Sequence, residues 1–169
     1  MKKLLPNEFH QSQRGYFSGL LYNEIIDNKD ICLITADLGF GQFDKIRDNF
    51  PDRFFNVGAD EQVMINIACG MALEGKIVFC YTITPFFWRS AEAIRIYANH
   101  EQIPIKMIGG GRDKDYKEDG FTHDGTDIRD LFNCFPNIVQ YFPDDKEDIE
   151  KILKTMITNN RPTFINLAR

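Results

Sequence analysis

The stretch NVGADEQVMINIACGMALEG, residues 56–75, sets an apolar run of helical spacing directly behind two adjacent acids, Asp60 and Glu61. A short β-rich run, residues 53–57, leads into it, and a second one, residues 76–83, follows it. A helical pattern between two apolar strands is the repeating unit of a parallel sheet. We therefore expect a strand, a helix that opens at Glu61 and then a second strand.

The same alternation continues along the chain, which is typical of strands buried on both faces. The sequence predicts an α/β domain at residues 13–169, with a doubly wound, mostly parallel sheet and helices on both faces, after a polar arm at residues 1–12. The other expected helices are 15–28, 43–50, 90–100, 127–135 and 146–159, and the other expected strands are 31–39, 103–109, 137–142 and 162–168.

Composition excludes several classes of function. The formal charge of -5 and the pI near 5.2, with dispersed Lys and Arg, argue against a nucleic-acid partner. No segment is long and apolar enough for a signal peptide or a membrane span, so we expect a cytoplasmic protein that does not bind membranes. The cysteines are far apart and form no C-x-x-C pair, so we expect four buried thiols: Cys32, Cys69, Cys80 and Cys134.

Polar and glycine-rich segments follow several of the expected strands. In open parallel sheets, ligands bind beyond the carboxyl ends of the strands. Asp37, the pair at 60–61, residues 82–89 and the loop 109–124 should therefore share one edge of the sheet.

Two glycine-rich segments admit a phosphate-binding alternative. GFGQFD, residues 39–44, resembles part of a dinucleotide fingerprint, but its third glycine is replaced by Asp44, which would repel a pyrophosphate at the helix N-terminus. GGG at 109–111 runs into a charged segment rather than a helix, so we expect a flexible loop there.

Glu61 has both a structural and a functional interpretation. An acid in the first helical turn stabilises the helix dipole, and Asp60 can cap the helix. However, apolar neighbours such as Val63, Met64 and Ile67 leave little wet surface for an exposed carboxylate. A carboxyl held against apolar side chains suits contact with the ring nitrogen of a ligand.

Two further segments offer side chains for a ligand. PFFWR, residues 85–89, places aromatic rings at a turn between strand and helix, where they can either sandwich a flat ligand or pack in the core. EDGFTHDG, residues 118–125, holds Asp119 and His123 in a polar loop that is either a site or a surface turn. The three histidines lack metal-ligand spacing, so we expect no metal ligands on this chain.

Taken in order, the segments GYFSGLL after Arg14, ADLG, FPDRFFNVGADEQ, GMALEG, TITPFFWRSAEAIR, EDGFTHDG and RPTFINLAR resemble the pyrimidine-binding domain of transketolase. The pattern is closest in style to the split transketolases and is also similar to deoxyxylulose-phosphate synthase. The resemblance covers nearly the whole chain, from Arg14 to Arg169, and its most specific parts are FPDRFFNVGADEQ and EDGFTHDG.

The resemblance implies a thiamine diphosphate enzyme that moves a two-carbon ketol unit from a ketose to an aldose, in carbohydrate metabolism. Glu61 would hydrogen-bond N1′ of the aminopyrimidine, Phe86 would stack on that ring, and Asp37 would lie near the thiazolium. Ile83 stands where relatives often have another aromatic residue, a role that Phe87 could fill. The residues expected to bind the cofactor are Asp37, Glu61, Phe86, Phe87 and Arg89.

The resemblance also assigns the substrate side of the site. Asp119 matches an acid that binds a substrate hydroxyl. His123 matches a histidine that could shuttle a proton, so the resemblance makes Glu61 and His123 the expected catalytic residues. Arg14 matches an arginine that holds a distal phosphate of sugar-phosphate substrates. Gly111 stands where some relatives have a second phosphate-binding histidine, and Arg112 beside it is the expected substitute.

The chain shows no G-D-G segment with a following Asn, which in this family binds magnesium and the diphosphate, and no third domain. We therefore expect a separate subunit that carries Mg²⁺ and the diphosphate half of the site, in a heterotetramer. Two alternatives remain: a subunit of a decarboxylating 2-oxo acid synthase or dehydrogenase, and a non-catalytic α/β binding module.

Overall fold

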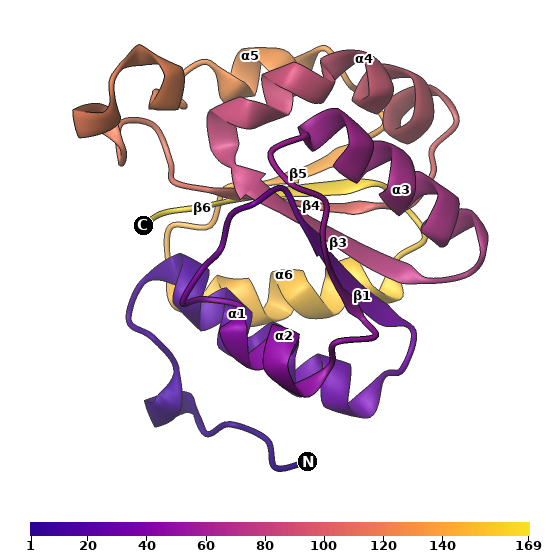
Figure 1. The fold of residues 1–169 in the computed structure, drawn as a ribbon. Coiled ribbons are helices and arrows are strands. Elements are labelled where there is room, and N and C mark those ends of the chain that lie inside the picture. Colours follow the sequence, from indigo (N-terminus) through magenta and orange to yellow (C-terminus); the bar gives the residue numbers. More distant parts are fainter.

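The computed structural model describes residues 1–169, which form a single six-stranded sheet with every neighbouring pair of strands parallel. The strand order is β2-β1-β3-β4-β6-β5, and Figure 1 labels these strands except β2. This confirms the predicted doubly wound parallel sheet. The strands are β1 Ile31–Thr35, β2 Phe54–Asn56, β3 Ile77–Ile83, β4 Lys106–Gly110, β5 Val139–Tyr141 and β6 Thr163–Leu167.

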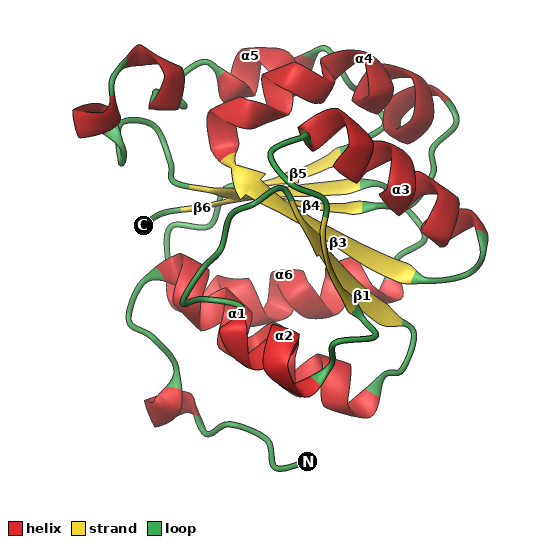
Figure 2. Cartoon of the chain, viewed as in Figure 1, coloured by secondary structure: helices red, strands yellow, loops and turns green.

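Helices cover both faces of the sheet (Figure 2). One face carries α1 Gln13–Asp27, α2 Asp44–Asn49 and α6 Lys146–Thr158, and the other carries α3 Glu61–Leu73, α4 Ala91–Ala93 and α5 Ile128–Asn133. Short 3₁₀ segments are η1 Pro6–Glu8, η2 Thr84–Ser90, η4 Lys117–Asp119 and η5 Phe121–His123, and a π-helix, η3, spans Ile94–His100. None of these helices combines the length and apolar character that crossing a membrane requires.

Alternate residues along each central strand enter two separate cores. In β3, Val78 and Cys80 pack under α3, whereas Phe79 and Tyr81 pack under α1 on the opposite face. This alternation explains why the strands appear as continuous apolar runs. The expectation of four buried thiols is wrong at one position, because Cys134 is exposed at the end of α5.

The segment after β3 differs from the single helix expected at residues 90–100. It begins as η2, with Pro85 in the first turn, passes through one turn of α4 and widens into η3. At its end, Asn99 uses both its side chain and its carbonyl to bind Asn137, over 3.0 and 2.9 Å. These bonds tie the segment to the start of β5.

The chain leaves neighbouring strands β1 and β3 toward opposite faces of the sheet. After β1 it enters α2, which packs in the core under α1, and after β3 it enters η2, which packs in the core under α3. Such a switch point opens a crevice at the carboxyl ends of the two strands, where open α/β sheets bind ligands.

Candidate functional site

Glu61 opens α3, and its carboxylate is buried at the carboxyl edge of β3. The preceding Asp60 caps the helix by accepting the Val63 backbone N–H over 2.9 Å. The Glu61 side chain is only 1% exposed, yet its neighbours are polar as well as apolar. Thr82 donates its hydroxyl to Oε1 over 3.2 Å, and Arg89 Nη1 donates to both oxygens at 3.1 Å. The expectation of an apolar enclosure is therefore wrong: the carboxylate is buried and paired.

Arg89 also covers an aromatic face. Its guanidinium carbon lies 4.1 Å from the centroid of the Phe86 ring, and its side chain is 53% exposed. A flat, cationic N–H donor thus stacks on Phe86 and bonds the carboxylate of Glu61 at the same time. Phe86 and Glu61 together thus hold one planar nitrogen group, the guanidinium of Arg89.

His123 extends this group along the edge of the sheet. Its ring centroid lies 5.1 Å from that of Phe86 and 6.4 Å from that of Tyr116, both at edge-to-face angles. Its Nδ1 is 3.0 Å from the hydroxyl oxygen of Thr122. Residues that follow three different strands therefore form one row, in which the Phe86 ring contacts both Arg89, the partner of Glu61, and His123.

Beyond Tyr116 the row ends in two arginines. The Arg14 guanidinium hydrogen-bonds the Tyr116 hydroxyl, and the guanidinium carbons of Arg14 and Arg169 lie 5.6 and 5.2 Å from the Tyr116 ring centroid. Neither arginine forms an ion pair with an acidic side chain. Unpaired guanidinium groups at the same place favour binding of an anion.

A cavity of about 520 Å³ opens beside Arg14 and Tyr116. It lies at the switch point, between the start of α1 and the glycine-rich loop that follows β1, and Tyr81 and Ile83 of β3 line it. Burial raises the pKa of Tyr81 to about 12. Its phenol therefore stays neutral at physiological pH and offers a hydrogen bond, here to Gln42 over 3.2 Å.

Phe87 lies outside this site, which corrects the expectation that it contacts the cofactor. Its side chain is fully buried, and its ring contacts those of Phe132 and Phe164 edge to face, at 5.9 and 5.6 Å between centroids. The turn of η2 points Phe86 to the edge of the sheet and its neighbour into the core.

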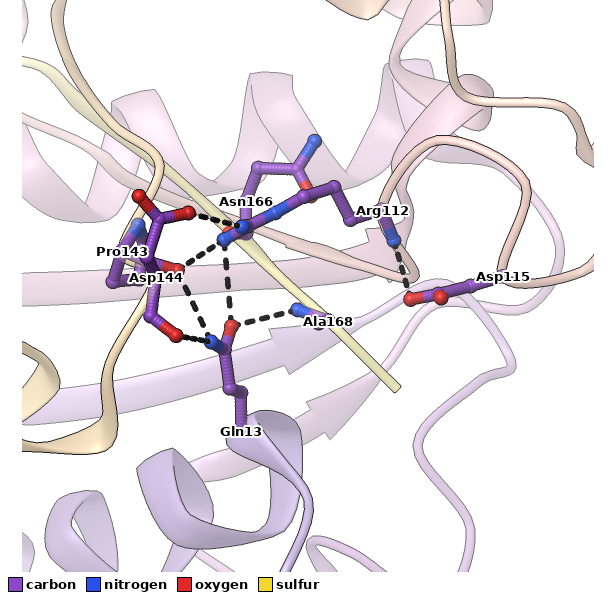
Figure 3. A network of polar contacts seen from close by, with 7 residues as sticks. All are labelled: Gln13, Arg112, Asp115, Pro143, Asp144, Asn166 and Ala168. Atoms are coloured by element: carbon purple, nitrogen blue, oxygen red, sulfur yellow. Dashed lines mark hydrogen bonds and ion pairs between the residues drawn. The ribbon is translucent and has the colours of Figure 1, made fainter.

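Arg112 likewise uses its guanidinium for hydrogen bonds within the chain, which corrects its expected role in substrate binding (Figure 3). Its Nη2 donates to the carbonyl oxygens of Pro143 and Asn166, and Nη1 donates to Asp144 over 3.3 Å. The Gln13 side chain, which precedes Arg14 on α1, accepts a further weak bond over 3.4 Å. The guanidinium thus joins three chain segments and does not line the cavity.

The two expected aspartates of the site are exposed. Asp37 follows β1 in a left-handed conformation with φ 55°, and its backbone N–H and carboxylate both bind the Asn56 side chain, over 2.9 and 3.2 Å. Asp119 ends η4, and its carboxylate makes no hydrogen bond within the chain. Neither carboxylate forms a hydrogen bond or an ion pair with a residue of the row from Glu61 to Tyr116.

Sequence reasoning placed Thr82 and Tyr116 in segments expected at this edge but gave neither a role, and it gave none to Arg169. Arg169 directly follows β6, so the same strand-edge rule that selected Asp37 contained its signal. Thr82 is hidden because a hydroxyl within a buried strand looks like an ordinary β-branched residue. Tyr116 sits in a charged loop whose path no periodic pattern specifies.

Fold and site together define a doubly wound α/β domain with a cavity at its switch point. The chain belongs to the transketolase pyrimidine-binding domain family: the family model described as "Transketolase, pyrimidine binding domain" matches residues 11–169. This family depends on thiamine diphosphate.

Among curated proteins, a "Putative transketolase C-terminal section" of Methanocaldococcus jannaschii is 29% identical over 143 residues, which cover 83% of this chain and 45% of that protein. A 1-deoxy-D-xylulose-5-phosphate synthase of Dehalococcoides mccartyi is 27% identical over 154 residues, or 90% of this chain and 24% of that protein. The chain thus spans about half or less of the length of these relatives.

Solved structures agree on the fold. A "Split gene transketolase, inactive beta4 tetramer" matches with a TM-score of 0.80 and 26% identity, over 94% of this chain and 51% of that one. Transketolase from Leishmania mexicana matches with a TM-score of 0.85 and 20% identity, over 98% of this chain and 26% of that one. The second match supports the fold alone.

Proposed function

We propose that this chain supplies the aminopyrimidine side of the active site of a transketolase-like enzyme, which transfers a two-carbon ketol unit from a ketose to an aldose. The observation that supports this most directly is Glu61, a carboxylate buried at the start of α3 and reached only by polar hydrogens from Thr82 and Arg89. Such a group suits a hydrogen bond to N1′ of the cofactor ring.

The stacked Arg89 supports the fit of that ring. An aminopyrimidine needs one aromatic face to stack on and one carboxylate to bond, and Arg89 uses both on Phe86 and Glu61. When the cofactor binds, the half-exposed Arg89 side chain has solvent into which it can turn. Phe86 would then stack on the ring.

When bound, thiamine diphosphate supplies the nucleophilic carbon and the electron sink for carbon–carbon cleavage. Glu61 controls the protonation of the ring at N1′, and burial excludes water from this contact. His123, in contact with Phe86, would take or return a proton at a substrate hydroxyl. Asp37 and Asp119 are the exposed acids that would approach the thiazolium and a substrate hydroxyl once a partner covers the edge.

Arg14 and Arg169 form the distal end of the proposed substrate site. Both guanidinium groups lack an acidic partner and lie against the Tyr116 side chain, which suits the phosphate of a sugar phosphate. This pair takes the role that the sequence had suggested for Arg14 and Arg112.

The diphosphate and Mg²⁺ would be held by a separate subunit, in a heterotetramer. By their names, one similar curated protein is a section of a transketolase and one similar structure is a split-gene transketolase. An exposed apolar strip on α3 supports such a partner, since Val63, Ile67 and Leu73 are 39%, 41% and 71% exposed on the helix that opens with Glu61. We call these three residues and Gly70 the α3 strip.

The test is reconstitution with a diphosphate-binding subunit. Addition of thiamine diphosphate, Mg²⁺, a ketose and an aldose should yield the two-carbon-extended sugar, and omission of either chain should abolish it. Robust turnover by this chain alone, or none by the assembled pair, would refute the proposal.

A decarboxylating synthase is the second candidate, since several similar curated proteins are 1-deoxy-D-xylulose-5-phosphate synthases. Pyruvate labelled at its carboxyl group separates the two chemistries. Release of labelled carbon dioxide with an aldose acceptor supports the synthase, whereas ketose-dependent transfer without release supports the transketolase-like reaction.

A further inference from the structure

Tyr116 occupies space that a side chain at position 111 would otherwise fill. A Cβ atom added at Gly111 would lie 2.1 Å from Cε2 of Tyr116, and the backbone there has φ 85°. Only glycine satisfies both constraints, because it has no Cβ and adopts a positive φ without strain. The absence of a side chain at position 111 therefore makes room for the Tyr116 ring, which lines the cavity.

The hydroxyl of Tyr116 fixes the orientation of Arg14. It accepts a hydrogen bond from Nη1, which leaves the edge formed by Nε and Nη2 without an acidic partner. Nε is buried and has no hydrogen-bond partner in the chain. A buried N–H without a partner is costly, and the Nε–Nη2 edge is a fork that matches two oxygens of a phosphate or carboxylate.

Tyr116 also keeps its own proton available. Its oxygen accepts from Arg14, so its O–H can donate to a further acceptor in the cavity. Arg169 lies over the same ring, 5.2 Å from the centroid, and its backbone N–H is anchored by Asp115 over 2.7 Å. Two cations and one phenol thus converge from three segments of this chain.

We propose that Tyr116 is a positioning residue that gives the site its preference for substrates with an anionic distal group. It binds Nη1 of Arg14, which leaves the Nε–Nη2 edge for an anion, and it adds one hydrogen-bond donor. The inference rests on the proposed function only in taking this anion to be the phosphate of a sugar phosphate. The groups involved all belong to this chain, so anion binding does not require the partner subunit.

Binding of inorganic phosphate to the full chain, followed by NMR titration, tests the inference directly. Tyr116→Phe keeps the ring and should weaken phosphate binding about tenfold, the effect of one lost hydrogen bond to a charged group. Arg14→Gln should abolish binding. Tyr97→Phe, which removes a hydroxyl from the partly exposed ring in η3, is the matched control and should bind like the unmodified chain. No binding by the unmodified chain, or equal binding by Tyr116→Phe, would overturn the inference.

The reconstituted enzyme gives a second readout. Tyr116→Phe should raise the KM for a phosphorylated sugar and leave kcat unchanged, with no effect on the KM for the same sugar without phosphate. An equal rise for both sugars would indicate a structural role and overturn the inference. If phosphate binding responds as expected but no thiamine-dependent turnover exists, the proposed function fails and the anion site remains.

Discussion

The guanidinium of Arg89 donates to both carboxylate oxygens of Glu61, at 3.1 Å each, while its flat face covers Phe86. These bonds hold the carboxylate in an orientation in which it accepts hydrogen bonds from a planar nitrogen donor. Because the same side chain is half exposed, it holds this position without closing the site to solvent.

Glu61→Gln should lower thiamine-dependent turnover of the assembled enzyme by about 100-fold or more, the usual loss when a proton-transfer group is removed. The amide oxygen can still accept from Thr82 and Arg89, and the half-exposed Arg89 can turn its remaining N–H groups to solvent, so the free energy of unfolding should fall by only about 1–2 kcal/mol. Steady-state kinetics and urea denaturation measure the two effects. Glu74→Gln, at the exposed end of the same helix, is the control. Full activity of Glu61→Gln would leave only a helix-stabilising role for this acid.

Phe86 and Phe87 should respond oppositely to truncation. Phe87→Ala opens a cavity in the core against Phe132 and Phe164, and should lower the free energy of unfolding by about 3–5 kcal/mol. Phe86→Ala should cost only about 1 kcal/mol but weaken cofactor binding. Denaturation curves and cofactor titration of the assembled enzyme distinguish the two. Loss of cofactor affinity in a stable Phe87→Ala variant would contradict the placement of Phe87.

Arg112→Met should destabilise the chain by about 2 kcal/mol or more, since it leaves the carbonyl groups of Pro143 and Asn166 without their charged donor. The loss arises where α1, the segment after β5 and the end of β6 meet. Arg95→Met, at an exposed position, should be neutral by the same urea denaturation. Unchanged stability, combined with a selective rise in KM for phosphorylated sugars, would return Arg112 to the substrate site.

Lys106 should make stability rise with pH. It lies at the opposite edge of the sheet, where its ammonium donates to oxygens of Asn159 and Arg161, and burial lowers its pKa from 10.5 to about 8. Between pH 8 and 10.5 the unfolded chain retains a proton that the folded chain has lost, so the free energy of unfolding rises by up to about 3 kcal/mol across this range. Lys106→Met lacks this titration. The difference in unfolding free energy between the two proteins should therefore grow from pH 8 to 10, and a flat difference would contradict the shift.

The order of strands and helices along the chain was predictable from periodic apolar patterns. The edge of the sheet that carries the site was predictable from strand direction. The segments that hold Glu61, Phe86 and His123 were selected on this basis, whereas the roles of the single residues came from the family resemblance. The structure brings these segments together at the edge. The expected pairing of these side chains with a cofactor stays a prediction.

What the sequence could not decide depends on local geometry. Phe86 and Phe87 are neighbours in a 3₁₀ helix, where successive residues point about 120° apart, so composition does not tell which one enters the core. The partners of Arg112 lie 31 and 54 residues away in the sequence. No local pattern encodes bonds of that range.

Gly70 of the α3 strip has one more consequence. Glycine within a helix costs about 1 kcal/mol relative to alanine. A Cβ atom at Gly70 would meet nothing within 4 Å, so packing inside this chain gives no reason for the residue. Gly70→Ala should therefore raise the melting temperature of the isolated chain. If the same change weakens subunit association, another helix packs directly against the backbone at Gly70. The helix that presents Glu61 is then less stable than it would be with alanine, because close packing against a partner requires glycine.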